Sequence, residues 1–316
     1  MSLITFVNLN GEHDFGGENS AHWREAHAYL AMLTRKYRIA AIARQELTHS
    51  RANGKRLLFA AGHALGMTGY IAASSTRESP NAPGIFVNEQ LLRVVADYPQ
   101  ETGWWHPACQ IKTVRAGTEA SPELNLASYH LCSNDAEWRR REALMMVKWG
   151  KNEQRPKDPD DRFGERVQTT YPCLWFGDQN SYSGDEADRA TLPDWDVVTD
   201  LPFRANRTTA DGRHDTGPWD VMTRAGFTDL ALHAHKHLGQ ELQGTASLIR
   251  TDQGNPDGIR RPRIDFGWGN GYIPETLEGV EIITKPIGSW TDHGMGLFHF
   301  RMNDFWDAVA ATASPR

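Results

Sequence analysis

The 316-residue chain is long enough to bury a sizeable core, and its 39% hydrophobic and 23% charged residues are the balance of an ordinary globular protein. Its formal net charge of −6 excludes a protein that coats nucleic acid through a dominant basic field, although a local basic patch would still serve a nucleic-acid enzyme. The cysteines Cys109, Cys132 and Cys173 are scattered and form no CxxC pair, which disfavours a disulfide framework and a cysteine zinc site.

No stretch of the sequence approaches the ~20 consecutive apolar residues that a membrane span needs. The first residues, MSLITFVNLNGEHD, do not place a basic segment before a long apolar one, so they do not have the pattern of a secretion signal. We therefore expect a cytoplasmic protein without a membrane partner.

The first 46 residues predict a β-α-β unit. ITFVNLN (residues 4–10) is a short apolar run that is typical of a buried strand, and RIAAIARQE (residues 38–46) is a second one. Between them, residues 21–37 carry apolar side chains at helical spacing behind a capping Ser20 or Asn19. A helix between two buried strands indicates a crossover connection over a sheet.

The rest of the chain is rich in predicted strands. They are MTGYIAASS, GIFVN, LLRVVADY, CQIKTVRA and ELNLASYHL between residues 67 and 131, then PCLWFGDQN, and finally RIDFGW, VEIITKPI and GMGLFHF. Residues 135–152 and 219–234 have helical patterns. Helices beside strand runs predict a layered α/β sandwich with mixed sheets. Because no repeat or linker divides the chain, we expect residues 1–316 to form a single domain, with loop insertions near 152–168 and 203–217.

Polar side chains recur where the predicted strands end. They are Asn8, Asn10, Glu46, His130, Asp178, Asn180, Asp265, Asp292 and His293. Carboxylate and amide oxygens suit Mg²⁺, Mn²⁺ or Ca²⁺, and such an ion stabilises charge on a phosphoryl oxygen. A histidine beside an aspartate can be held as the imidazolium and face a phosphate. Each motif alone is more often a turn or a solvated strand end, so only the ordered set predicts a metal-assisted phosphoester hydrolase.

That ordered set resembles the endonuclease/exonuclease/phosphatase superfamily, whose fold is DNase I-like. Six stretches between residues 3 and 300 carry the resemblance: F-V-N-L-N-G, A-R-Q-E-L, S-Y-H-L, G-D-Q-N, R-I-D and T-D-H. The resemblance implies a four-layer α/β sandwich of two packed mixed β-sheets flanked by helices. The chain departs from the family pattern at Gln179, which is usually apolar, and at Thr291, which is usually serine.

The resemblance also implies a metal site. Glu46 would be the principal ligand of Mg²⁺ or Mn²⁺, with help from Asp292 and Asn10. Many members carry an acidic residue where this chain has the neutral Asn10, so we favour one metal ion over two. His130 would lie across the phosphate and assist the leaving group.

The remaining site residues receive their roles from the same resemblance. Asp178 would activate or orient the attacking water, while Asn8 and Asn180 fix that geometry by hydrogen bonds. His293, paired with Asp265, would donate to a phosphoryl oxygen and offset charge in the transition state.

Three functions remain open at this point. The leading one is a phosphodiesterase, and specifically a nuclease. The second is a phosphatase or phosphodiesterase on a small phosphorylated metabolite, which the overall acidity of the chain keeps open. The third is a non-catalytic binding module on the same fold. The partner is accordingly a phosphoester, either nucleic acid or a small molecule, and the oligomeric state stays open.

The loop before Asp265 is a candidate substrate contact. Arg260, Arg261 and Arg263 lead straight into this aspartate, so we expect the loop to rim the cleft. Arginines there would grip a second phosphate or a nucleic-acid backbone. A loop held by salt bridges is equally open.

Two further motifs have plainer explanations. HAHKH places His233, His235 and His237 two residues apart, and on a helix such neighbours do not share a face. EWRRREALMMVKWGK looks basic, but from Asp135 to Lys151 its five positive charges face three negative ones, which is ordinary for a solvated helix face.

Overall fold

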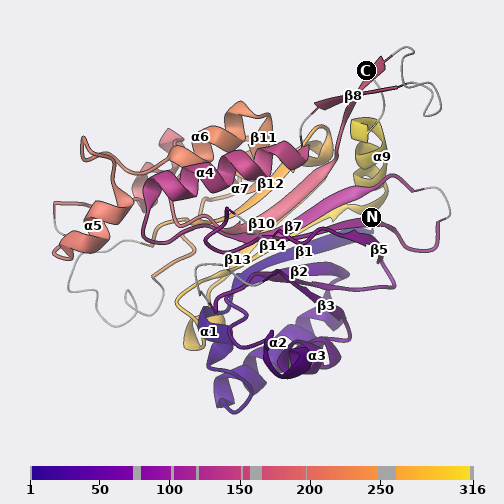
Figure 1. Cartoon of the computed structure of the whole chain (residues 1–316), viewed down its shortest axis with the longest axis horizontal. Helices are drawn as coiled ribbons and strands as arrows, with labels where there is room; N and C mark the ends of the chain where they lie inside the picture. The colour runs from indigo at the N-terminus through magenta and orange to yellow at the C-terminus, as the bar shows by residue number, and fades with distance from the viewer. Residues whose placement is uncertain are drawn as a thin grey trace.

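Two six-stranded mixed sheets pack against each other in the centre of the protein (Figure 1). The computed structural model describes residues 2–73, 80–100, 103–118, 121–150, 152–156, 166–196, 198–247 and 261–313. In spatial order the first sheet contains β13 (Leu277–Ile283), β14 (Met295–Arg301), β1 (Leu3–Asn10), β2 (Ile39–Gln45), β4 (Gly84–Val87) and β3 (Thr68–Ile71). The second contains β11 (Phe227–Asp229), β12 (Asp265–Asn270), β10 (Cys173–Asp178), β7 (Leu124–His130), β6 (Cys109–Arg115) and β5 (Leu92–Asp97).

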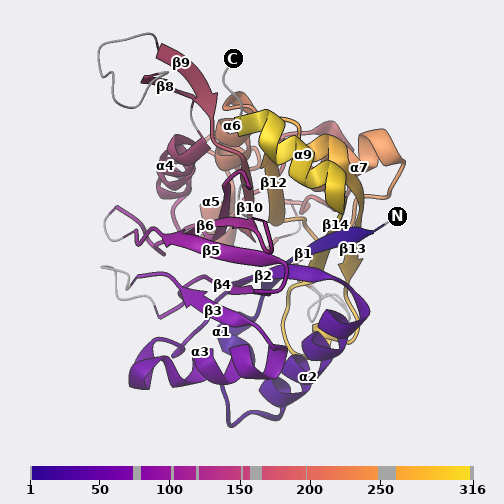
Figure 2. The same ribbon diagram turned by 90° about the vertical axis from the view of Figure 1, so that its right-hand side faces the viewer.

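Helices cover the outer faces of both sheets, so that the molecule has four layers (Figure 2). The first sheet carries α1 (Glu12–Phe15), α2 (Ala21–Lys36) and α3 (Ala52–Leu65). The second lies beside α4 (Ala136–Val147), α5 (Leu201–Arg207), α6 (Gly217–Arg224) and α7 (Leu230–Leu238), and α9 (Met302–Ala313) follows the last strand. Short 3₁₀ turns cover Lys148–Gly150, Glu186–Thr191, Ile273–Thr276 and Ile287–Ser289. The predicted four-layer sandwich is therefore confirmed.

Strand alternation divides the apolar side chains between two kinds of core. In β1, Phe6 points into the core between the sheets and stacks on Phe176 at a ring distance of 6.1 Å. Val7 points the other way and packs with Leu30 and Leu58 of the covering helices. Because successive side chains of a strand face opposite ways, a strand buried on both faces is apolar at nearly every position. This is why the strands could be recognised as continuous apolar runs.

The sequence interpretation missed the helices α1, α3, α5 and α9. The single helix expected over residues 219–234 is wrong, because α6 ends at Arg224 and Gly226 turns the chain with φ at 84°. Residues Phe227–Asp229 then pair with β12 before α7 begins.

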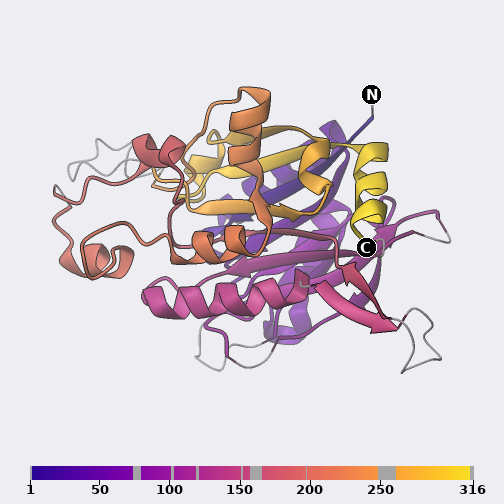
Figure 3. The ribbon, with the colours of Figure 1, turned by 90° about the horizontal axis from the view of Figure 1, so that it is seen from above.

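The two expected loop insertions contain regular structure. Residues Asn152–Pro156 and Arg166–Thr170 form a hairpin, β8 and β9, that stands apart from the main sheets (Figure 2). The segment near residues 203–217 begins within α5, which lies at the opposite end of the molecule from α9 (Figure 3). Within the described ranges, no helix is both long and apolar enough to cross a bilayer.

The parallel strand pairs bring the functional candidates to one edge. In the first sheet Asn10 lies opposite Gln45, and in the second Asp178 lies opposite His130. The antiparallel β12 starts at the same edge, with Asp265 opposite Asp178. Parallel strands end on the same side of a sheet, so three chemically active side chains stand in one row across β7, β10 and β12.

Gly177 is the residue that lets β10 approach β7 closely. A Cβ at this position would lie 2.0 Å from the carbonyl oxygen of Tyr129. We expect Gly177→Ala to destabilise the protein by roughly 3 kcal/mol, since a backbone atom cannot move aside as a side chain can. Gly269→Ala in neighbouring β12 is the matched control, because its Cβ would meet only side-chain atoms at 3.3–3.5 Å. Urea denaturation compares the two, and equal stabilities would contradict the prediction.

Candidate active site

Asp178 is an acid at this edge that is held through both of its carboxylate oxygens. It is the last residue of β10 and is buried. Its Oδ1 accepts the backbone N–H of Asn180 at 2.8 Å, and its Oδ2 accepts the amide Nδ2 of Asn10 at 3.1 Å. The Nε2 of His130 lies 3.6 Å from the same Oδ2. With both oxygens engaged, this carboxylate is held in one orientation.

Glu46 stands just beyond the end of β2. It takes a left-handed conformation, with φ at 58°. Its Oε1 accepts the amide Nδ2 of Asn10 at 3.3 Å, so one amide bridges Glu46 and Asp178. Its Oε2 accepts the backbone N–H of His13 at 3.0 Å and the Nδ2 of Asn81 at 3.2 Å. His13 and Asn81 were not predicted, because neither lies at the end of a strand.

The N–H group of His13 reaches Glu46 because residues 12–15 form one left-handed turn. Their φ angles run from 34° to 55°, although none of the four is glycine. Such a conformation costs roughly 1–2 kcal/mol per residue in L-amino acids. Buried Asp14 offsets this cost by pairing with Arg44 at 2.7 Å and accepting the hydroxyl of Ser50 at 3.0 Å. The buried contacts of Asp14 therefore stabilise the left-handed turn.

The half-buried His293 and the buried Asp265 form a pair on the other side of Asp178. The Nδ1 of His293 lies 3.0 Å from the Oδ2 of Asp265. Burial works to lower the pKa of His293, but the charges of Asp265, Asp178 and Glu46 outweigh it and raise that pKa to about 10. His293 is therefore an imidazolium at neutral pH. Within the described residues, potential metal-ligand atoms of Asp178, Asp265 and His293 lie within 4.8 Å of one another.

His130 faces the two acids through Nε2, which lies 3.9 Å from the Oε1 of Glu46. Its ring stacks on that of His106 with centroids 4.4 Å apart and planes 6° from parallel. The Nδ1 of His106 bonds to the backbone carbonyl of His130 at 3.1 Å. This stack fixes the imidazole of His130 from below, and sequence reasoning did not find His106.

Asn8 and Asp292 lie in supporting positions. The Nδ2 of Asn8 donates to the carbonyls of Gly177 and Phe266 at 3.4 Å each, which joins the first sheet to the second. The backbone N–H of Asp292 donates to Glu12 at 2.9 Å, and so ties the loop before β14 to the left-handed turn.

Asn180 directs its side chain away from the acids. Its Nδ2 donates to the carbonyl of Leu131 at 2.9 Å, and its Oδ1 accepts from Arg207 at 2.6 Å. Its hydrogen bond to Asp178 is made by the backbone N–H. Asn180 thus orients the carboxylate through its backbone rather than through its side chain.

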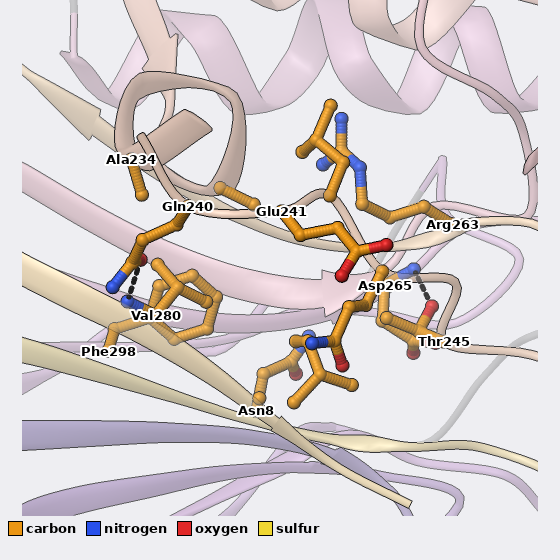
Figure 4. Close-up of a pocket in the computed structure, with 14 residues that line it drawn as sticks. Asn8, Ala234, Gln240, Glu241, Thr245, Arg263, Asp265, Val280 and Phe298 are labelled. Carbon is orange, nitrogen blue, oxygen red and sulfur yellow. Dashed lines mark hydrogen bonds between the residues drawn. The ribbon is translucent and has the colours of Figure 1, made fainter. Parts of the chain in front are cut away.

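A small cavity of about 20 Å³ lies behind Asp265 and is lined also by Asn8, Thr245, Gln240 and Glu241 (Figure 4). Here the hydroxyl of Thr245 accepts the backbone N–H of Asp265 at 3.1 Å. The loop after α7 therefore supports the start of β12.

The expectation that Arg263 grips a substrate is wrong. Its guanidinium is buried and donates to both oxygens of Asp188 and of Asp229. Two carboxylates leave it no free face for a phosphate. Arg261, two residues before it, is half-buried, and its contact with substrate stays a prediction. Arg260 lies outside the described residues.

The HAHKH motif and the basic helix α4 both differ from their simple explanations. HAHKH lies on α7, where the rings of His233 and His237 are 4.5 Å apart because residues four apart share a helix face. The basic helix α4 is not simply a solvated face, since Arg139 is buried and bonds to Asp215 at 2.8–2.9 Å.

The donor set fits a hard divalent ion. Glu46 and Asp178 present carboxylate oxygens on either side of the amide of Asn10, and Mg²⁺ and Mn²⁺ prefer such oxygen ligands. No cysteine lies among these residues, and the three cysteines of the chain are free and buried.

Comparison with known proteins identifies the fold. No protein-family model matches the sequence, and no curated protein matches it. Among solved structures, TDP2 from D. rerio complexed with single-strand DNA product superposes with a TM-score of 0.59 at 13% identity, covering 95% of this chain and 100% of that one. An AP endonuclease from Archaeoglobus fulgidus gives 0.56 at 14% identity, covering 95% and 99%. An endonuclease/exonuclease/phosphatase from Bacteroides vulgatus gives 0.58 at 12% identity, covering 95% and 99%.

The chain therefore has the fold of the endonuclease/exonuclease/phosphatase proteins, the DNase I-like fold. This confirms, at the level of fold, the resemblance carried by the six sequence stretches.

The buried network beneath the left-handed turn predicts a pH dependence of stability. The Nε2 of His27 accepts from Arg44 at 3.1 Å while its Nδ1 donates to the carbonyl of Trp23 at 2.7 Å. Burial, helped by the charge of Arg44, lowers the pKa of His27 from 6.5 to about 3. Below pH 6.5 His27 is therefore protonated in the unfolded chain, whereas in the folded chain it stays neutral down to about pH 3. The contribution of neutral His27 to the free energy of unfolding is complete above pH 6.5 and is lost as the pH falls toward 3.

We expect His27→Gln to remove this pH dependence, because glutamine can still accept from Arg44 but does not titrate. Between pH 6.5 and 4.5 the wild type should lose roughly 2 kcal/mol more stability than the variant. Urea denaturation at a series of pH values measures the difference. His63→Gln, at an exposed position of α3, should keep the wild-type slope. Identical slopes for wild type and His27→Gln would show that His27 does not titrate as described.

Proposed function

We propose that the protein is a metal-dependent hydrolase of phosphoester bonds, and that it cleaves phosphodiesters as a nuclease does. The observation that carries this proposal is the acid Asp178, fixed on both oxygens and lying beside the Asp265–His293 pair. The fold supports it, because the similar structures include a complex of TDP2 with single-strand DNA product and an AP endonuclease.

Glu46, with help from Asp292, would hold Mg²⁺ or Mn²⁺. Asn10 is not placed as a ligand, because its Nδ2 donates to Glu46 and its Oδ1 accepts the backbone N–H of Glu12 at 3.0 Å. A bound ion of this kind offsets negative charge on a phosphoryl oxygen and on the departing oxygen. The surrounding donors have a separate task. Asn10, Asn81 and the N–H group of His13 fix both oxygens of Glu46, so the ligand does not have to be ordered when the ion arrives.

Asp178 is the residue that receives the proton of the attacking water. As the water oxygen bonds to phosphorus, the ester P–O bond breaks and the leaving oxygen takes up a proton that His130 would donate. His293 has Nδ1 engaged by Asp265, so its remaining donor, the Nε2–H, is directed at a phosphoryl oxygen. His130 presents Nε2 from the opposite side and serves the leaving group.

An activity screen tests the reaction class. The purified protein is incubated with Mg²⁺, Mn²⁺ or EDTA and with plasmid DNA, RNA oligonucleotides and a panel of phosphorylated metabolites. Cleavage of nucleic acid supports the proposal. Turnover of a metabolite alone would replace the nuclease by a small-molecule phosphoesterase, and no turnover on any substrate would support a binding module.

Replacing the proposed base separates catalysis from binding. Asp178→Asn should lower kcat by ~10²–10⁴-fold, the usual contribution of a positioned proton acceptor, with KM little changed. Steady-state kinetics on the best substrate of the screen provides the measurement. Asp194→Asn, an exposed acid remote from the row of strand ends, should behave as wild type. Full turnover by Asp178→Asn would remove Asp178 from its role.

Replacing the proposed metal ligand isolates metal binding from turnover. Glu46→Ala should weaken the binding of Mg²⁺ and of Mn²⁺ by at least tenfold, because a carboxylate ligand is lost. Isothermal titration calorimetry on the substrate-free protein measures this directly. Glu137→Ala on the exposed face of α4 is the control and should bind as wild type. Equal affinities for wild type and Glu46→Ala would place the ion elsewhere.

A further inference from the structure

The loop that follows β10 is held by an arginine from a distant part of the chain. Arg207 is the last residue of α5 and is buried. Its Nη2 donates to the side-chain Oδ1 of Asn180 at 2.6 Å, and its Nη1 donates to the backbone carbonyl of the same residue. This two-point contact uses the planar fork of a guanidinium, which a lysine cannot reproduce. None of the six family-like stretches contains Arg207.

These bonds complete the hydrogen bonding of Asn180. Its backbone N–H donates to the Oδ1 of Asp178, its Nδ2 donates to the carbonyl of Leu131, and both of its oxygens accept from Arg207. Asn180 also has a left-handed backbone, with φ at 52°. Such a conformation persists only where the surroundings enforce it. Arg207 provides two of the four bonds that enforce it.

Arg207 is not explained as half of a buried ion pair. The acids whose charges act on Arg207 are Asp178 and Asp215. Asp178 accepts hydrogen bonds from Asn180 and Asn10, while Asp215 uses Oδ2 to bind Arg139 and Oδ1 to accept the backbone N–H of Gly217 at 3.0 Å. In the described part of the chain, the side-chain hydrogen bonds of Arg207 go to Asn180. Burying a cation against neutral acceptors is unfavourable, so a purely structural role accounts poorly for this choice of residue.

The chain segment around Arg207 is anchored where the guanidinium enters. The backbone N–H of Asp215 donates to the carbonyl of Arg207 at 3.0 Å, and Thr208 bridges to His214. The backbone N–H of Tyr182 donates to the carbonyl of Asp215 at 3.0 Å. Backbone hydrogen bonds thus hold the segment that contains α5 against the loop after β10. The side chain of Arg207 reaches from this segment into that loop.

We infer that Arg207 is a positioning residue that acts on Asp178 through Asn180. The inference rests on the proposed function of Asp178. By fixing the left-handed Asn180, Arg207 aims its N–H at one carboxylate oxygen of Asp178 and leaves the other to Asn10. Without Arg207 the loop relaxes, the carboxylate turns and the attacking water loses its acceptor, while the groups that hold substrate are unchanged.

Kinetics of Arg207→Ala on the substrate that the wild type cleaves tests this. We expect kcat to fall on the order of 10²-fold, as for a misplaced catalytic group, with KM within about twofold of wild type. Guanidinium chloride at millimolar concentration should restore part of kcat, and ammonium chloride at equal ionic strength should not. Arg213→Ala is the matched control: it lies on the same excursion but is exposed and paired with Asp211, and it should keep full activity.

A double-mutant cycle distinguishes positioning from other roles. Asp178→Asn combined with Arg207→Ala should be no slower than Asp178→Asn alone, because both changes remove the same contribution. A further loss in the double variant, or a raised KM with unchanged kcat, would show that Arg207 acts directly on the substrate and would overturn the inference. If Arg207→Ala does not fold, Arg207→Gln and Arg207→Lys replace it and should show the same cycle.

Hydrogen exchange of the Asn180 backbone amide, measured by NMR, provides a readout that needs no substrate. In the wild type this amide should be protected, and in Arg207→Ala its protection should fall at least tenfold while amides in β10 keep theirs. Unchanged protection overturns the inference even if the protein is a hydrolase. If Arg207→Ala loses this protection but the wild type has no hydrolase activity, the contact between Arg207 and Asn180 is supported and the proposed function is rejected. Failure of the inference and failure of the proposed function are therefore distinguishable.

Discussion

One amide group joins the two sheets where the chemistry is placed. The Nδ2 of Asn10, at the end of β1, donates to Glu46 in its own sheet and to Asp178 in the other. Its two hydrogens fix the distance between the proposed metal ligand and the proposed base, and this distance holds only if the sheets keep their relative position. Asn8 adds two bonds between the sheets, and Gln45 adds another by donating to Ser128 at 3.1 Å. The neutral residue at position 10 therefore has a structural reason: a carboxylate there would face two others without a proton to share.

Three buried arginines that pair with carboxylates support the loops around this edge. Arg44 pairs with Asp14 below the left-handed turn, Arg139 pairs with Asp215 below the loop after β7, and Arg263 pairs with two acids at the start of β12. Burying such pairs is expensive, and apolar replacements are often as stable. Their directed hydrogen bonds, however, specify where each loop begins, which apolar contacts do not. The three pairs, with their desolvation cost, therefore lie where the loops around the site begin.

The sequence was most informative where one physical signal dominates. Continuous apolar runs predicted strands buried on both faces, and their polar ends predicted which residues share the edge. The supporting residues were invisible for an equally physical reason. Arg207, His106 and Asn81 lie on loops or at a helix end, and their partners are fixed by tertiary packing rather than by spacing. The prediction for Arg263 was wrong because the sequence does not show whether an arginine near a site faces solvent or two buried acids. The break between α6 and α7 depends on Gly226 and on pairing with β12, which no helical periodicity reports.

The position of β1 has a consequence for how the protein is made. This strand is synthesised well before β14, yet its neighbours in the sheet are β2 and β14, which pairs Leu3 with Arg301. Until residues up to Arg301 have left the ribosome, one edge of β1 has no native partner, and an open strand edge is a template for pairing with other chains. Contacts separated by nearly 300 residues also close late in folding. This apolar edge of the nascent chain is therefore open until β14 is made, and the edge that carries the candidate site residues is complete only then.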